Sequence, residues 1–305
     1  MSTSEVTELG TRDRPVRPHA GQSAVEAATS PGVSGLGLRF VGSEIALLFG
    51  RRRNLVLLAV LALAPVALGI AVDVSNSSSP GEGPSFLSQI TDNGLFLVFT
   101  SLVVTLPIFL PLAVAVSCGD AVAGEASSGT LRNLLVVPVG RTRLLVVKYV
   151  GIVVWAAACT LTVALVGLLV GLALFPHGSV TLLSGSTIGY GAAVWRAVLV
   201  TLYVIAMLAG VGAIGLFVST LTEVPIAAMA AVIVLTVISE IVDAIPQLSV
   251  VHPYLFSHPW LAFGDLLRQP VALTGIGHGL ATQLAYVVVF GALSWARFTS
   301  KDITS

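Results

Sequence analysis

The sequence predicts an all-α membrane protein that crosses the bilayer several times. Hydrophobic residues make up 55% of the 305 positions and charged residues only 10%, whereas roughly a quarter of residues are charged in soluble domains. The mean hydropathy is +0.96, and the apolar residues gather in runs of about 20, the length that spans a bilayer core. Such runs are expected to be helices, because lipid offers the backbone no hydrogen bonds. The formal net charge is zero, so no nucleic-acid partner is expected.

The amino-terminal region is expected to contain a tail and an interfacial helix. Residues 1–35 mix Ser, Thr, Pro, Gly and both signs of charge without periodicity, which predicts a disordered cytoplasmic tail. Residues 36–305 are predicted to form one transmembrane domain. Four apolar residues recur at helical spacing before the first long apolar run: Leu38, Val41, Ile45 and Leu48. They predict an amphipathic elbow helix in the cytoplasmic interface, ended by the basic triplet at 51–53. A plain extension of the first span is the alternative, and Glu44 argues against it.

Six apolar runs are long enough to be transmembrane helices. They are Asn54–Val74, Leu95–Ser117, Val146–Phe175, Val194–Val218, Val224–Ala244 and Ile276–Ala296. Pro65, Pro107 and Pro111 lie inside the first two spans. Each should bend its helix, because proline removes a backbone hydrogen bond and clashes with the preceding turn.

The basic residues predict the orientation of these spans. With the amino terminus in the cytoplasm, only Arg196 and Arg268 among the lysines and arginines fall on the outer side. The loops at 75–94 and 176–193 contain no lysine or arginine. Cytoplasmic loops normally carry the excess of positive charge, so both termini are expected in the cytoplasm.

The segment Leu248–Leu267 is apolar enough to suggest a seventh span. Polar residues interrupt it at His252-Pro253, His258-Pro259 and Asp265. A seventh span would also place the basic carboxyl-terminal end outside, against the charge rule. We therefore expect short re-entrant helices that dip into the outer leaflet, with Tyr254 and Trp260 as interfacial anchors. The two histidines could ligate a metal, but a following proline more simply marks a turn or a helix start, and no metal site is predicted.

Few residues carry recognisable catalytic or cofactor-binding chemistry. The lysines are Lys148 and Lys301, and neither follows a glycine, so the chain has no P-loop for ATP. A serine-protease-like motif, Gly32 to Gly35, lies in the tail, away from any histidine-bearing span that could supply its base. Cys118 and Cys159 are too few for a disulfide framework or a metal cluster. We expect no catalytic, cofactor-binding or metal-binding residue.

Two acidic residues occur near the outer end of the fifth span. Glu240 and Asp243 are three residues apart, which puts them on one helix face. Carboxylates inside a membrane are costly and often functional, so the pair could belong to a substrate or proton path. A structural role is the alternative, because water or Arg196 could satisfy both groups at the interface.

A polar break, Gly119–Arg141, separates the second and third spans. It offers Asp120 and Glu125 close to the membrane surface, followed by turn residues at 127–130. Leucines at 131, 134 and 135 then form an apolar face, and Pro138 ends the predicted helix. A short amphipathic surface helix suits docking into a groove of a cytoplasmic partner, although an ordinary linker between spans is the alternative.

This break resembles the ABC-2-type permease family, the membrane subunits of ATP-binding-cassette exporters. The resemblance rests on Gly-Asp-x-x-x-x-Glu-x-x-x-Gly-Thr-Leu-Arg-x-Leu-Leu-x-x-Pro-Val-x-Arg between the second and third spans. It implies that the segment is a coupling helix on a separate ATPase subunit. The implied coupling residues are Asp120, Glu125, Gly129, Thr130, Arg132, Pro138 and Arg141. ATP and Mg²⁺ would then be bound by the partner ATPase, with no cofactor on this chain.

The resemblance also implies a function and an assembly. The chain would be a permease subunit in the cell membrane, paired with a second permease subunit and not itself an enzyme. Pro107 and Pro111 would be candidate hinges, and the substrate would be a hydrophobic or amphipathic solute such as a drug, antibiotic, lipid or peptide. Two rivals remain: an intramembrane enzyme that uses Glu240, Asp243 and the outer histidines, and a membrane scaffold that transports nothing.

Overall fold

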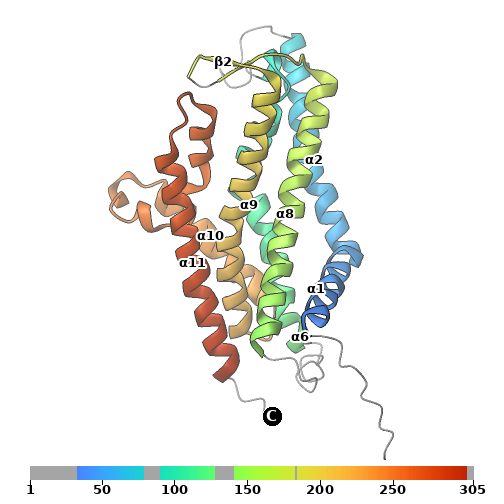
Figure 1. Cartoon of the computed structure of the whole chain (residues 1–305), viewed down its shortest axis with the longest axis vertical. Helices are drawn as coiled ribbons and strands as arrows, with labels where there is room; N and C mark the ends of the chain where they lie inside the picture. The colour runs from blue at the N-terminus through green and yellow to red at the C-terminus, as the bar shows by residue number, and fades with distance from the viewer. Residues whose placement is uncertain (1–32, 79–89, 128–140, 183, 301–305) are drawn as a thin grey trace, which may run out of the picture. The chain divides into compact units, whose positions relative to one another are not determined.

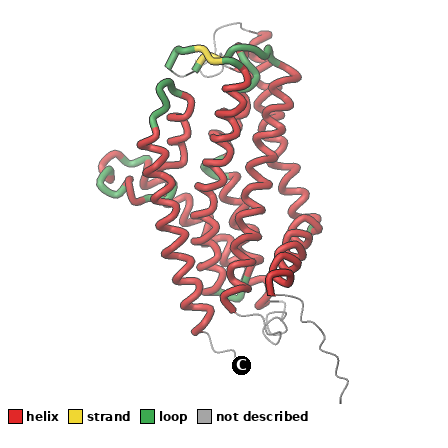
Figure 2. Tube along the Cα trace, viewed as in Figure 1, coloured by secondary structure: helices red, strands yellow, loops and turns green. Residues whose placement is uncertain are grey.

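The computed structural model describes residues 33–78, 90–127, 141–182 and 184–300. Contacts divide the chain into two units, Met1–Arg39 and Phe40–Ser305, and the second unit carries the architecture described below. Helices make up most of the described chain (Figures 1 and 2). They are α1 (Val33–Gly50), α2 (Arg52–Ser78), α4 (Phe96–Thr105), α5 (Phe109–Ala121), α6 (Ala123–Ser127), α8 (Arg141–Leu174), α9 (Tyr190–Leu221), α10 (Pro225–Asp243) and α11 (Leu273–Ser300).

Five of these helices, α2, α8, α9, α10 and α11, are long and apolar enough to cross a membrane. The pair α4 and α5 makes a sixth if the two count as one bent span. The prediction of an all-α polytopic membrane protein is therefore confirmed. The helices generally extend beyond the predicted spans, because their polar ends continue the helical hydrogen bonding outside the apolar run. For example, α8 begins at Arg141 rather than near Val146.

The second span is broken at Pro107. Helices α4 and α5 meet at an angle of 56° across the residues between Thr105 and Phe109, as expected where proline has no N–H to donate. Pro111 does not interrupt its helix, because it lies in the first turn of α5, where an N–H has no intrahelical partner anyway. Helix α2 likewise continues through Pro65.

Helix α9 is the central helix of the second unit. It packs against α5, α8 and α11, and most of its length is buried. Small residues allow this close packing, as is common between helices in membranes. A Cβ at Gly215 of α9 would lie only 2.4 Å from Cys118 Sγ of α5, and one at Gly212 would lie 2.8 Å from a methyl carbon of Ile152 in α8.

Two short irregular regions join the long helices. Between α8 and α9, β1 (Val180–Thr181) pairs antiparallel with β2 (Thr187–Ile188), where only a loop was expected. Between α10 and α11 lie three 3₁₀ helices, η1 (Pro246–Leu248), η2 (His252–Tyr254) and η3 (His258–Leu267). Short helices were predicted here. Trp260, however, is buried at 2% exposure against Phe256, so the expectation that it anchors an interface is wrong, whereas Tyr254 is exposed.

Candidate functional site

Charged side chains gather where α1, α5, α6 and α8 meet, a group that we call the elbow cluster. Its members are Glu44 of α1, Arg51 between α1 and α2, Arg53 of α2, Asp120 of α5, Glu125 of α6 and Lys148 of α8. All of them except Arg53 line a small pocket of about 40 Å³. A hydrogen bond holds the turn between α1 and α2 on one side of this cluster, since Asn54 Nδ2 of α2 donates to the Leu48 carbonyl of α1 at 2.9 Å.

Lys148 is the centre of this cluster. Its side chain is only 6% exposed, and Nζ donates to Glu44 Oε1 at 2.8 Å and also to Glu125 Oε1. A lysine buried this deeply is stable only when it is paired. One cation therefore joins the elbow helix to the residues that follow the second span.

Asp120 makes the second connection. Arg51 Nη1 and Arg53 Nη2 both donate to its Oδ2, and the aspartate side chain is 16% exposed. Both arginines belong to the triplet that was expected at headgroup level. In the structure they hold the end of α5 against the start of α2.

The junction between α5 and α6 is also fixed from the central helix. Ser219 Oγ of α9 accepts hydrogen bonds from the backbone N–H groups of Val122 and Ala123, at 3.2 Å and 3.0 Å. These donors lie where α5 ends and α6 begins, and the serine is fully buried. The start of the polar break is thus attached to α1, α2, α8 and α9 together.

Burial also changes the acidity of Glu125. Loss of solvent raises the pKa of this carboxyl above its usual value, and the nearby Lys148 ammonium opposes that rise by favouring the charged form. The charged form of the Glu125 carboxyl therefore depends on the Lys148 ammonium beside it.

The structure reaches only part of the predicted coupling segment. Gly129, Thr130, Arg132 and Pro138 lie outside the described residues, and Arg141 is the first residue of α8. Asp120 and Glu125, both predicted to be coupling residues, lie in the elbow cluster. Sequence reasoning did not assign Glu44, Arg51, Arg53 or Lys148 to the site. The usable signal was a lysine inside an otherwise apolar helix, which requires an acidic partner.

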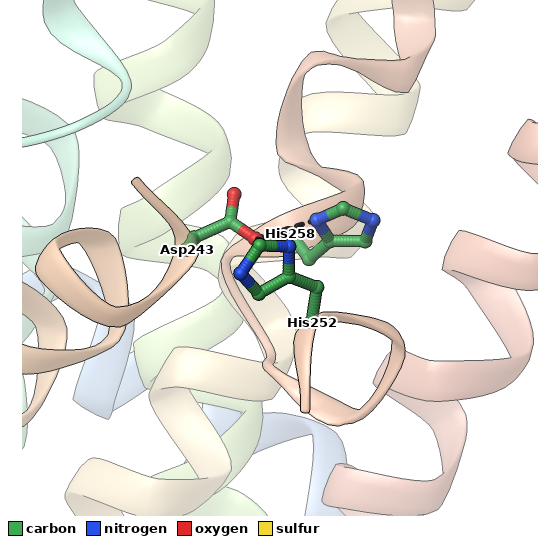
Figure 3. Close-up of side chains that lie close together, drawn as sticks. All are labelled: Asp243, His252 and His258. Atoms are coloured by element: carbon green, nitrogen blue, oxygen red, sulfur yellow. Dashed lines mark hydrogen bonds and ion pairs between the residues drawn. The ribbon is translucent and has the colours of Figure 1, made fainter. Parts of the chain in front are cut away.

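A second polar cluster lies at the carboxyl-terminal end of α10. Figure 3 shows Asp243, at the end of α10, with the His252 and His258 side chains directed toward it from the segment that follows. His258 Nδ1 is 2.6 Å from Asp243 Oδ1, and His252 Nδ1 is 3.9 Å from the same oxygen. The predicted intramembrane polar site paired Asp243 with Glu240, and the enzyme alternative added the outer histidines. The structure brings Asp243 and both histidines together. The two His-Pro pairs six residues apart were the signal that pointed to them.

These features define a class of protein: a polytopic helical membrane protein with one charged cluster at the elbow helix and one Asp-His-His cluster at the far end of α10. A family model described as "Protein of unknown function (DUF2705)" matches residues 67–304. The chain belongs to this family. The match includes Asp120, Glu125, Lys148 and the Asp-His-His cluster, and it begins after Glu44 and the arginine triplet. No curated protein matches the chain.

Proposed function

We propose that this chain is the permease subunit of an ATP-binding-cassette exporter of the ABC-2 type, located in the cell membrane. It would act with a second permease subunit and with separate ATPase chains that bind ATP and Mg²⁺. The elbow cluster is the observation that carries the proposal. Together with Ser219, it joins the start of the polar break to α1, α2, α8 and α9. A segment that receives force from a partner needs such connections.

The ion pairs suggest how movement would be transmitted. A push on residues 119–141 reaches α1 through Lys148 and Glu44, and α2 through Asp120 and the two arginines. Ser219 passes the same movement to α9. The helices would then rotate as rigid bodies and switch a path between inward and outward access, with the break at Pro107 as the hinge of the second span.

The placement of the helix ends supports an orientation with both ends of the domain in the cytoplasm. Helices α1 and α6, the start of α8 and the end of α11 lie at the same end of the second unit (Figure 1). Trp295 Nε1 of α11 donates to Thr142 Oγ1 of α8 at 3.0 Å. This end carries the arginine triplet and Arg297, in accord with the positive-inside rule.

Apolar cavities between the helices support a hydrophobic or amphipathic substrate. One cavity of about 280 Å³ lies between α8, α9 and α11, with Tyr149 and Trp295 in its lining. Another, of about 130 Å³, is lined by α4, α8, α9 and the adjoining Leu95. A drug, a peptide or a lipid chain would fit such surfaces better than a free ion.

Reconstitution tests the proposal directly. The chain would be co-expressed with an ATPase chain encoded by a neighbouring gene, purified as a complex and placed in lipid vesicles. We expect the complex to hydrolyse ATP and the chain alone to hydrolyse none. Reversing charge with Glu125→Lys should abolish ATP-driven export of a fluorescent amphipathic dye, whereas the exposed variant Arg297→Met should retain it. Robust hydrolysis by the chain alone, or a dye flux that is independent of ATP, would overturn the assignment.

Absence of any complex with the ATPase chain would instead favour the membrane scaffold. Blue-native electrophoresis of the co-expressed chains separates this outcome from a complex that assembles but does not transport. An intramembrane enzyme would retain its activity without the ATPase, and that activity would be lost with Glu240→Gln or Asp243→Asn.

A further inference from the structure

We propose that Asp243, His252 and His258 form a binding site for a divalent transition-metal ion, with Zn²⁺ as the preferred ion. The site lies beyond the end of α10 that is far from the elbow cluster. Helix α10 contains 19 residues, which separate its two ends by about 27 Å at 1.5 Å per residue. This proposal is independent of the transport function.

The three side chains have the separation that a metal site needs. Their ligand atoms all lie within 4.8 Å of one another. Zinc bonds of about 2.0–2.1 Å in tetrahedral geometry place neighbouring ligand atoms about 3.3 Å apart. That value falls between the observed Asp243–His258 distance of 2.6 Å and the Asp243–His252 distance of 3.9 Å. Each of the two distances to Asp243 would change by less than an ångström on binding.

The hydrogen bond on the far side of His252 sets its tautomer. His252 Nε2 lies 3.1 Å from the Ile245 carbonyl oxygen, which can only accept, so Nε2 carries a proton. The Nδ1 lone pair of the neutral ring then faces the Asp243 carboxylate, an arrangement that calls for a cation between them. Metal-binding histidines commonly donate their other N–H to a backbone carbonyl in this way.

The backbone holds both histidines in place before an ion arrives. His252 is the first residue of η2 and His258 is the first residue of η3, and each is followed by proline. Proline fixes φ and lowers the entropy that binding must overcome. A buried hydrogen bond of 2.7 Å between Ser239 and Ser257 also ties α10 to the residue before His258.

The donor set selects the kind of metal. Two imidazole nitrogens and one carboxylate oxygen suit zinc and its transition-metal neighbours, whereas Ca²⁺ and Mg²⁺ prefer oxygen alone. Three protein ligands leave a fourth position for water or another small ligand, as in zinc sites that are not purely structural. The His258 side chain is 43% exposed, which gives an ion a route to the site.

Cobalt titration tests the site with the full chain. The purified protein in detergent would be treated with chelator and then titrated with Co²⁺ alone. We expect one Co²⁺ per chain, with the visible d–d absorption of a low-coordinate site, and displacement by Zn²⁺. X-ray absorption on the zinc-loaded protein should show two imidazole ligands.

Substitutions identify the ligands. His252→Gln, His258→Gln and Asp243→Asn should each weaken Co²⁺ binding by more than the ~10–100-fold that loss of an outer-shell partner causes. His177→Gln and His278→Gln change exposed histidines elsewhere, and Glu240→Gln changes the acid one turn away, so these controls should keep wild-type affinity. If Asp243→Asn does not fold, His252→Gln and His258→Gln still test the site.

Equal Co²⁺ binding in the wild type and in the double variant His252→Gln/His258→Gln would overturn the proposal. A wild-type protein that binds neither Co²⁺ nor Zn²⁺ would also overturn it. Neither result would affect the proposed transport function, which is measured by ATP-dependent flux.

Discussion

Replacing Lys148 with methionine tests the elbow cluster most sharply. Methionine keeps the length and the apolar stem of the side chain but removes the ammonium that joins Glu44 to Glu125. The two carboxylates, 17% and 20% exposed, would lose their common partner. Removing one member of a buried ion pair costs about 3–5 kcal/mol. At about 2–4 °C per kcal/mol, the apparent melting temperature should fall by on the order of 10 °C.

The loss should depend on pH in a defined direction. The pKa of Glu125 is raised in the folded protein, so the folded state holds this proton more tightly than the unfolded chain. The carboxyl therefore favours folding most when it is protonated. Stability falls as the pH rises above about 4.3, the ordinary pKa of a glutamate side chain. Without Lys148 to favour the charged form, the fall should be steeper. The destabilisation should therefore be smaller at about pH 5 than at about pH 8.

The assay is thermal unfolding in detergent, followed by intrinsic tryptophan fluorescence at both pH values. Arg297→Met, at an exposed position of α11, controls for loss of a positive charge. The double variant Lys148→Met/Glu125→Gln should regain part of the stability, because it removes one of the stranded charges. A melting temperature that matches the Arg297→Met control, or one that shifts equally at both pH values, would refute this account.

Two other substitutions test the packing and the break. Pro107→Ala restores an N–H in the broken span, so it should reduce ATP-coupled transport without lowering the melting temperature, whereas Pro111→Ala in the first turn of α5 should transport normally. If the two variants transport alike, the hinge is not at Pro107. Gly171→Ala places a Cβ 2.1 Å from the Gly94 carbonyl oxygen and should cost about 1–3 kcal/mol of stability. Gly291→Ala, which meets nothing within 4 Å, should leave the melting temperature unchanged, and equal melting of both glycine variants would contradict the close packing.

The span positions could be predicted because lipid imposes one requirement on every residue of a span. Apolar runs of sufficient length must be helices, so α2, α8, α9, α10 and α11 follow from composition alone. The break at Pro107 could be predicted because proline always lacks the N–H that a helix needs. The predicted bend at Pro111 was wrong because the effect of a proline depends on where its helix begins. The break at Pro107 makes α5 begin at Phe109, so Pro111 lies in the first turn.

The elbow cluster could not be predicted because its members meet only after folding. Glu44 and Lys148 are 104 residues apart in the chain, and the local sequence around each residue does not predict that the two are in contact. The Asp243 carboxylate meets the histidines because the chain turns through η1 and η2. The prediction for Trp260 was wrong because the sequence around an aromatic residue near an interface is similar whether the side chain faces lipid or the protein core.

The break in the second span has an electrical consequence. At the residues around Pro107, the carbonyl end of α4 meets the amide end of α5, so opposite partial charges from two half-helices face each other within an apolar layer. Pro107 cannot donate to the carbonyl of Val103. Val103, Ile108 and Phe109 are exposed beside the break. In the dimer proposed above, a second permease subunit placed on this apolar face would shield the opposed half-helix ends from lipid.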